Sequence, residues 1–237
     1  MVITDWSKIH DRDNSWRQQL QGQLIAAYVL DRYLVLFEEA FRNNGVLSFL
    51  ELGSGNGDLS KKILEARLPC VGKYVVSECF NEGIEWLSSL GLEVLKLDAQ
   101  KINLPDESFD VVLSFDVMHH VEDPRAMAVE MLRVSRKRLL LTEANGLSIG
   151  RKIFELSPGH KAAGEKSFRP SVYLDFFRKV PGYRLTSTRI YPLLFVFKTP
   201  SALAPALISF SRFIEKVPLL KWQCATVCLD ITFERIR

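Results

Sequence analysis

The sequence has no uncharged apolar stretch that approaches the roughly 20 residues of a membrane-spanning helix. It opens with Met-Val-Ile-Thr-Asp-Trp-Ser-Lys, which lacks the basic and then apolar order of a secretory signal. Cysteine is scarce: four residues, at positions 70, 79, 224 and 228, form neither a C-x-x-C pair nor the density of a disulfide framework. We therefore expect a cytoplasmic protein whose thiols are reduced and which holds no structural metal.

The composition fits neither a disordered nor a fibrous chain, because 47% of the residues are hydrophobic and 25% are charged. A chain of 237 residues is long enough to bury a full core as one domain. The net charge of +3 conceals an asymmetry: residues 1–145 hold 16 Lys and Arg against 22 Asp and Glu, whereas residues 146–237 hold 15 against 6. A basic second part is compatible with an anionic substrate, a membrane surface or nucleic acid, although a solvated surface is the commoner explanation.

Predicted strands and helices alternate along most of the chain. Strands are predicted at 46–50, 73–77, 92–97, 109–115 and 138–143, and helices at 16–41, 59–66, 81–90 and 124–135. This alternation implies right-handed crossovers and a parallel sheet. The later segments are a helix at 171–180, strands at 183–191 and 226–233, and an apolar stretch at 201–222 that Pro205 and Pro218 interrupt.

The expected fold class is therefore α/β, with a doubly wound, mostly parallel, seven-stranded Rossmann-like sheet. The two late strands are predicted to form an antiparallel edge hairpin, with the helical insertion between them. Residues 1–237 are expected to be one domain, in which residues 1–45 form N-terminal helices and residues 46–145 the cofactor-binding core. Residues 146–237 are the expected substrate-side segment, with its helical insertion at about 200–222.

A glycine-rich segment follows the first predicted strand. Phe49 to Asp58 reads Phe-Leu-Glu-Leu-Gly-Ser-Gly-Asn-Gly-Asp, so a buried strand leads through a tight turn into a helix. Its three glycines let the backbone turn sharply and approach a ligand closely, and the first free amides of the helix face a negative group. The spacing is neither the dinucleotide fingerprint G-x-G-x-x-G nor a phosphate loop, since no lysine follows the last glycine.

Polar residues end the next parallel strands. Glu78 ends the second strand, 21 residues after Gly57, where a carboxylate can accept both hydroxyls of a ribose. Asp98 ends the third strand and is a candidate to contact a ligand. Alternatively, its side chain forms an Asx turn with the local backbone. Ser114 and Phe115 end the fourth strand. Because ligands bind outside the carboxyl ends of the strands in open α/β sheets, these residues are predicted to share one site.

Four motifs in this order resemble those of class I S-adenosylmethionine-dependent methyltransferases. Residues 51–57, acid-x-Gly-x-Gly-x-Gly, resemble the first motif; residues 98–99, Asp-Ala, resemble the adenine-contacting pair; and residues 109–112 resemble the fourth-strand motif. Residues 118–124, Met-His-His-Val-Glu-Asp-Pro, resemble the L-H-H-V-x-D-P turn of the type 11 subfamily, which includes ubiquinone and menaquinone methylases. The combined resemblance covers about residues 46–145.

This resemblance implies a methyltransferase whose cofactor is S-adenosylmethionine. It places the adenine at Asp98 and Ala99, and the methionine part of the cofactor near the end of the fourth strand. The residues predicted to bind the cofactor are Glu51, Gly53, Ser54, Gly55, Gly57, Glu78, Cys79, Asp98, Ala99, Ser114 and Phe115.

Methyl transfer from a sulfonium requires in-line positioning of the nucleophile more than covalent catalysis, and a general base helps when the nucleophile carries a proton. Histidine suits that role, and the candidates are His119, His120 and His160. His160 is preferred because it lies in a later segment that resembles the substrate-covering part of small-molecule methyltransferases. Glu143 and Asn145, at the end of the fifth strand, are further residues predicted to face the substrate.

The predicted acceptor is a small molecule or a lipid-like compound, methylated at oxygen, nitrogen or carbon. The alternatives are a nicotinamide-dependent oxidoreductase, a binding protein without turnover and an RNA methyltransferase. A nucleic-acid partner is not expected, because no RNA-binding module or N-P-P-[YF] signature is present. The apolar, basic segment 201–222 has two interpretations, a lid packed on the sheet or an entrance for an amphiphile that touches a membrane surface.

Overall fold

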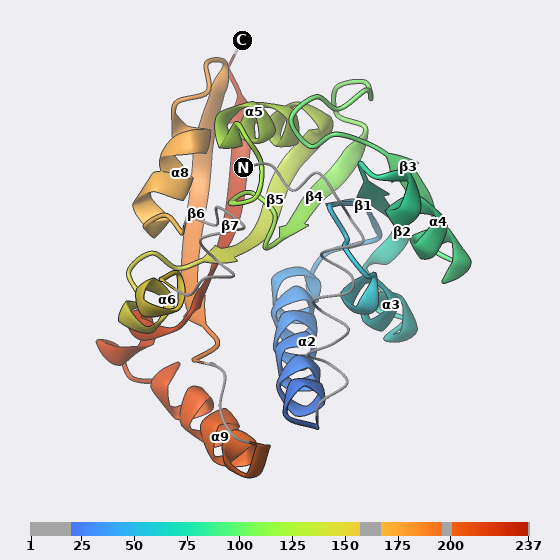
Figure 1. Cartoon of the computed structure of the whole chain (residues 1–237). Coiled ribbons are helices and arrows are strands. Elements are labelled where there is room, and N and C mark those ends of the chain that lie inside the picture. The colour runs from blue at the N-terminus through green and yellow to red at the C-terminus, as the bar shows by residue number, and fades with distance from the viewer. Residues whose placement is uncertain (1–19, 157–166, 196–200, 237) are drawn as a thin grey trace.

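The computed structural model describes residues 20–156, 167–195 and 201–236, which form a seven-stranded sheet flanked by helices (Figure 1). The strands lie in the order β3-β2-β1-β4-β5-β7-β6. Their bounds are β1 Leu47–Leu52, β2 Val71–Glu78, β3 Val94–Lys96, β4 Phe109–Phe115, β5 Ser135–Ala144, β6 Tyr183–Leu193 and β7 Thr226–Arg235. The helices are α2 Leu20–Phe41, α3 Asp58–Glu65, α4 Asn81–Ser89, α5 Pro124–Val134, α6 Ile149–Phe154, α8 Pro170–Arg178 and α9 Ala204–Ile214, with 3-10 turns η1 Ser201–Leu203 and η2 Leu220–Gln223.

The predicted fold class is confirmed by the strand directions. Strands β1 to β5 pair in parallel, whereas β7 pairs antiparallel with both β5 and β6. In the β5–β7 pair, Ala144 lies opposite Thr226, and in the β6–β7 pair Leu193 lies opposite the same Thr226. The carboxyl ends of β5 and β6 and the amino end of β7 therefore meet at the edge of the sheet where the other parallel strands also end.

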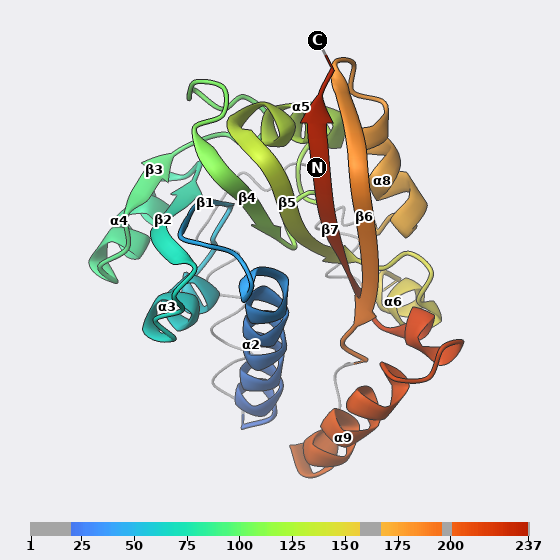
Figure 2. The same cartoon turned by 180° about the vertical axis from the view of Figure 1, so that it is seen from behind.

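Alternating side chains of the central strands build two apolar layers. In β4, Val111 and Leu113 pack with residues of α2, α3 and α4, whereas Val112 faces α5 and α8. Figures 1 and 2 show these two groups of helices on opposite faces of the sheet. Burying each such aliphatic side chain contributes about 1.5–3 kcal/mol. The near-continuous apolar runs of β1 and β4 follow from this burial on both faces.

The structure differs from the predicted elements in the third strand and in one additional helix. The third strand is shorter than predicted, because it comprises Val94–Lys96 and not 92–97; Leu92 and Leu97 are buried by side-chain packing without extending the strand. Helix α6 was not predicted from the sequence, since its Ile149 and Ile153 are exposed and a short helix without a buried face has no core periodicity. The interrupted helix of segment 201–222 is confirmed as η1, α9 and η2.

Helix α9 packs on α2 and beside the end of β6, and its Ile208 contacts the apolar layer on that face of the sheet; its interpretation as a lid stays a prediction. The Tyr28 hydroxyl donates to Ser211 Oγ at 3.1 Å, and the Leu194 and Phe195 amides donate to side chains of α9 and the residue after it. No described helix is both long enough and apolar enough to cross a membrane. All four cysteines are unpaired. The division of the chain at residues 45 and 145 stays a prediction.

The β5–β7 pairing contains a buried ion pair that leads to a stability prediction. Arg138 Nε and Nη2 each lie 2.9 Å from one carboxylate oxygen of Asp230. Asp230→Ala is expected to lower the free energy of unfolding by about 3 kcal/mol, because it leaves a buried guanidinium unpaired. Glu234→Ala is the matched control, since it breaks the exposed pair with Arg184 between β6 and β7 and should cost less than about 1 kcal/mol. Urea denaturation measures both values, and equal losses would contradict the importance of burial.

Candidate active site

The loop between β1 and α3 has a backbone shape that depends on its three glycines. Gly53, Gly55 and Gly57 have φ values of 64°, 55° and 77°, in the left-handed region that side chains disfavour. A Cβ on Gly57 would lie 2.7 Å from Leu87 Cδ2, and one on Gly53 would lie 2.9 Å from a methyl group of Val117. A Cβ on Gly55 would meet nothing within 4 Å. The loop is thus closed against the protein at two glycines and open at the middle one, where a ligand can approach the backbone.

Glu51, the acid of the first motif, is hydrogen-bonded to the helix that follows this loop and to the neighbouring strand β2. Its side chain is buried, and Oε2 accepts hydrogen bonds from Ser60 Oγ at 2.7 Å and from the Tyr74 hydroxyl at 2.6 Å. Burial raises the pKa of Glu51, and the two hydroxyls oppose that shift. The carboxylate therefore ties the end of β1 to α3 and β2. Its predicted contact with a cofactor stays a prediction.

Ser54, in the same loop, is held by its backbone. Its amide donates to the Ser77 carbonyl of β2 at 3.1 Å, so the loop is hydrogen-bonded to the strand that ends at Glu78. Glu78 is buried, and its Oε1 accepts from the Cys79 amide at 2.7 Å. The carboxylate also forms a side-chain hydrogen bond with the Cys79 thiol. Burial and the Glu78 carboxylate raise the pKa of the Cys79 thiol to about 12, so that Cys79 is neutral at ordinary pH.

Asp98 lies two residues beyond the end of β3, on an exposed turn. Its Oδ1 accepts from the Gln100 amide at 2.8 Å, which is the Asx turn that the sequence allowed as the alternative. Its Oδ2 has no hydrogen-bond donor among the described residues, so the turn presents one carboxylate oxygen outward. Ala99 is partly buried against the α5 layer. Glu78 lies opposite Lys96 in the β2–β3 pair, which brings the two acids to neighbouring strand ends.

Ser114 and Phe115 lie at the end of β4, beside the glycine loop, because Leu52 and Ser114 are directly paired across β1 and β4. Ser114 is fully buried, and its Oγ has no hydrogen-bond partner in the described part of the chain. Phe115 stacks on Tyr33 of α2 with 5.7 Å between ring centroids. An unsatisfied hydroxyl at a strand end is the type of group that a bound polar ligand completes.

Two residues at this edge were not among the predicted site residues. Asp116, with a φ of 59°, follows β4 directly, and its Oδ2 accepts from the Tyr33 hydroxyl at 2.7 Å. Burial, reinforced by Asp116, raises the pKa of Tyr33 well above its usual range, so the phenol keeps its proton. An isolated tyrosine in an N-terminal helix carries no sequence signal that it reaches a strand end 83 residues away.

His119 and Glu143 form a buried pair between the turn after β4 and the end of β5. His119 Nδ1 lies 2.7 Å from Glu143 Oε2, and Glu143 Oε1 accepts from the Met118 amide at 2.7 Å. Burial lowers the pKa of His119, but the hydrogen bond and charge of Glu143 outweigh it and leave the pKa above its usual value. Burial in turn raises the pKa of Glu143, which His119 opposes. Glu143 thus fixes the turn and the ring, and its predicted contact with the substrate stays a prediction.

The other predicted catalytic residues have separate places. His120 is partly buried, and its ring centroid lies 4.0 Å from that of His119. His160 lies outside the described residues, and its role stays a prediction. Asn145 is buried and donates to the carbonyls of Trp222 and Cys224, so it anchors η2 to β5, and its predicted contact with the substrate stays a prediction. In the described residues, no group of three or more His, Cys, Asp and Glu side chains is placed to hold a metal ion.

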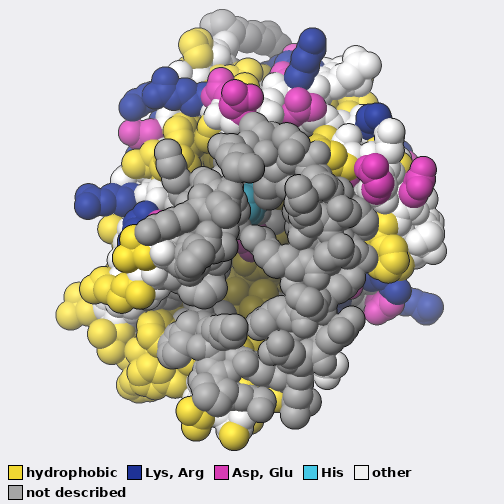
Figure 3. Space-filling model, viewed as in Figure 1, with side chains coloured by type: hydrophobic (Ala, Val, Ile, Leu, Met, Phe, Trp, Pro, Cys, Tyr) yellow, Lys and Arg dark blue, Asp and Glu magenta, His cyan; other side chains and the backbone are white. Residues whose placement is uncertain are grey.

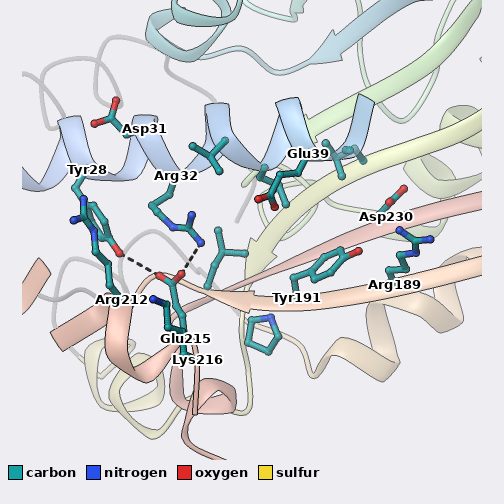
Figure 4. Close-up of a pocket in the computed structure, with 16 residues that line it drawn as sticks. Tyr28, Asp31, Arg32, Glu39, Arg189, Tyr191, Arg212, Glu215, Lys216 and Asp230 are labelled. Atoms are coloured by element: carbon teal, nitrogen blue, oxygen red, sulfur yellow. Dashed lines mark hydrogen bonds and ion pairs between the residues drawn. The ribbon is translucent and has the colours of Figure 1, made fainter. Parts of the chain in front are cut away.

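A cavity of about 560 Å³ lies elsewhere, between α2, β6 and α9 (Figure 4). Arg32 and Glu39 of α2, Arg189 and Tyr191 of β6, and Arg212 of α9 line it. None of the predicted cofactor residues lines this cavity. The polar strand ends, the glycine loop and the His119 pair together form the candidate active site, which is distinct from the cavity.

Comparison with known proteins gives matches to the same part of the chain. Residues 50–140 match a family model described as a methyltransferase domain. A curated protein, phosphatidylethanolamine N-methyltransferase of Cereibacter sphaeroides, is 34% identical over 92 residues, which are 37% of this chain and 45% of that protein. The chain therefore spans less than half the length of this curated relative.

Two solved structures resemble the whole fold. An S-adenosylmethionine-dependent methyltransferase of Thermotoga maritima has a TM-score of 0.66 and 19% identity, over 95% of this chain and 96% of that one. The magnesium protoporphyrin IX methyltransferase of Synechocystis, solved with bound S-adenosylhomocysteine, has a TM-score of 0.51 and 16% identity, over 86% of this chain and 81% of that one. At these identities the likeness shows that the fold is shared.

The His119–Glu143 pair predicts a specific titration. Because the folded-state pKa of His119 is raised above the unfolded value of about 6.5, the pair stabilises the fold below that pH, and this contribution is lost as the pH rises through the folded-state pKa. Glu143→Gln removes the charge and leaves burial as the dominant influence, so the pKa of His119 should fall below its usual value. NMR titration of the imidazole measures the pKa of His119 in the wild type and in the variant. An unchanged pKa in the variant would exclude Glu143 as the cause of the shift.

Proposed function

We propose that this protein, whose residues 50–140 form a class I S-adenosylmethionine-dependent methyltransferase domain, transfers methyl groups to a lipid-like acceptor. The observation that carries the cofactor assignment is the open backbone at Gly55, flanked by the unsatisfied groups of neighbouring strand ends. The acceptor class is supported by the name of the curated relative, which methylates a phospholipid amine by that name. Nitrogen is accordingly the proposed acceptor atom.

The residues at the sheet edge fit this cofactor. The Glu78 carboxylate suits ribose hydroxyls, the second oxygen of Asp98 suits an adenine amino group, and the unsatisfied Ser114 hydroxyl suits the polar end of the methionine part. The cofactor supplies an electrophilic methyl group on a sulfonium, which is a good leaving group. The protein must therefore orient the acceptor and exclude water.

A protonated amine must lose its proton before it can accept a methyl group. His119, held at Nδ1 by Glu143, presents its other ring nitrogen as the proton acceptor when it is neutral. Because its pKa is raised, this neutral form becomes the dominant one only at a higher pH than for an ordinary histidine. His120 and His160 are the alternative bases, and alanine substitution of each of the three, assayed for turnover, ranks them. A base typically contributes about 10²- to 10⁴-fold in rate.

The described cysteines support a cytoplasmic location, since Cys79 is exposed and all four thiols are unpaired. The division into a cofactor core and a substrate-side segment fits the same proposal. The cofactor-facing residues all precede residue 145, and the apolar segments α6, η2 and α9 follow it. A phospholipid acceptor also requires that the enzyme reach a membrane surface.

Cofactor binding is the first test. Isothermal calorimetry should detect S-adenosylmethionine and not NADH. Glu78→Ala should weaken binding by about 1–3 kcal/mol, the cost of an unpaired buried polar partner. Gly55→Leu should abolish measurable binding, because its side chain would occupy the open space at the loop. Glu85→Ala, an exposed acid on α4, is the matched control and should bind as the wild type does. Binding of NADH alone would refute the methyltransferase proposal.

Turnover is tested with methyl-labelled cofactor and a cell extract separated into lipid, small-molecule and RNA fractions. Label in the lipid fraction supports the proposed acceptor. Label in RNA would replace it with the RNA methyltransferase alternative. Cofactor binding without label in any fraction would indicate a binding protein without turnover.

A further inference from the structure

Large apolar side chains are exposed together on and directly beside α6, η1, α9 and η2, a region that we term the apolar edge surface. Nine of the 17 large apolar side chains that are exposed in the described part of the chain belong to it. Ile149 and Ile153 of α6 are 66% and 65% exposed, and Leu219 before η2 is 86% exposed. Figure 3 shows hydrophobic side chains gathered at the lower left, where Figure 1 places these segments. The nine residues are Leu147, Ile149, Ile153, Leu156, Leu203, Phe210, Phe213, Leu219 and Leu220.

Polar contacts hold α6 beside η2, although about 70 residues separate them in the chain. Ser148 Oγ donates to the Gln223 carbonyl at 2.8 Å, and Gln223 Oε1 accepts from the Ile149 amide at 3.0 Å. Asn145 donates to the Trp222 carbonyl at 3.0 Å. The apolar side chains of α6 and of the η2 region are therefore presented as one surface.

Glu215, at the end of α9, fixes the third part of the surface. Its Oε2 lies 2.6 Å from Arg32 Nη2, and its Oε1 accepts from the Tyr28 hydroxyl at 3.2 Å, as the dashed lines of Figure 4 show. Both partners belong to α2. With α9 held on α2 in this way, Phe210 and Phe213 stay exposed instead of packing on the core.

The apolar edge surface lies at the carboxyl edge of the sheet, which also carries the candidate active site. Helix α6 follows the end of β5, and η2 precedes the start of β7. Ala144 at the end of β5 is paired with Thr226 at the start of β7. A molecule that lies on this surface is consequently on the same side of the protein as the turn of His119 and Glu143.

The net charge of the segments that form the apolar edge surface indicates which kind of partner it binds. Residues 147–156 and 201–225 hold five basic and two acidic residues. Both acids are engaged within the protein, Glu215 by Arg32 and Glu155 by Lys152 and the Ser167 amide. Lys216 and Lys221 have no ion-pair partner among the described residues, and Lys221 lies 6.0 Å from the Trp222 ring. Such a surface attracts anionic headgroups, whereas two copies of it repel each other.

We propose that the apolar edge surface docks this protein on an anionic membrane, with its apolar side chains among the acyl chains and Lys216 and Lys221 at the headgroups. The docking rests on the proposed function only for its biological purpose, since the exposed side chains, the contacts that hold them and the charge do not depend on it. Docking would bring the carboxyl edge of the sheet to the lipid, where a phospholipid amine is available without leaving the bilayer.

Vesicle co-sedimentation of the full chain tests the docking. Vesicles of phosphatidylcholine with phosphatidylglycerol should bind it at low ionic strength, and high salt should weaken binding. Lys216→Glu with Lys221→Glu should reduce the partition coefficient by at least about fivefold per residue, whereas Lys137→Glu at the amino end of β5 should change it little. Ile153→Ser with Leu219→Ser should reduce it by at least about tenfold, and Ile236→Ser, similarly exposed elsewhere, should not.

Calorimetry with S-adenosylmethionine accompanies each variant and separates the two proposals. Unchanged cofactor affinity together with lost vesicle binding supports a dedicated docking surface. A wild type that binds the cofactor but no anionic vesicle would overturn the docking and leave the methyltransferase proposal intact. Sedimentation equilibrium tests whether a second copy of the chain binds this surface instead. A dimer that Leu219→Ser dissociates would identify a second copy, and not a membrane, as the partner.

Discussion

The insertion of β7 between β5 and β6, antiparallel to both, is the constraint on which the arrangement of this molecule depends. A strand parallel to β5 in this position would begin at the amino edge of the sheet, so the segment before it would lie far from the carboxyl edge. With β7 reversed, Thr226 lies opposite both Ala144 and Leu193, and the segments before and after these positions return to the edge where the parallel strands end. The buried Arg138–Asp230 pair reinforces that junction from the middle of the two strands.

The same edge combines two kinds of surface with different physical requirements. The cofactor side needs rigid backbone and unsatisfied polar groups, which the three left-handed glycines and the Glu51 hydrogen bonds provide. The apolar edge surface exposes hydrophobic area to water, which is unfavourable. Its segments therefore need contacts to neighbouring elements that keep them in place. Glu215 and Asn145 supply that support through hydrogen bonds to neighbouring elements. The residues that hold these segments in place are thus different from the apolar side chains that they expose.

Fold likeness alone does not identify chemistry in this architecture, because function resides in the groups at the strand ends. Here the paired His119 and Glu143 are the only buried acid–imidazole pair in the described part of the chain. Their position after β4 and at the end of β5 places a titratable group beside the cofactor loop. The match of residues 50–140 to a methyltransferase domain covers the carboxyl ends of β1 to β4 and the glycine loop, the same strand ends that carry the candidate active site.

The sequence by itself determined the sheet, the glycine loop and the positions of Glu78 and Ser114, because side-chain periodicity and glycine spacing are local properties of the chain. It could not determine that Asp98 closes an Asx turn with only one of its oxygens, or that Glu143 pairs with His119. It also left α6 unrecognised. The tertiary structure decided these points, since hydrogen bonds such as Ser148 to Gln223 join residues far apart in the chain and depend on strand order, which no local pattern encodes.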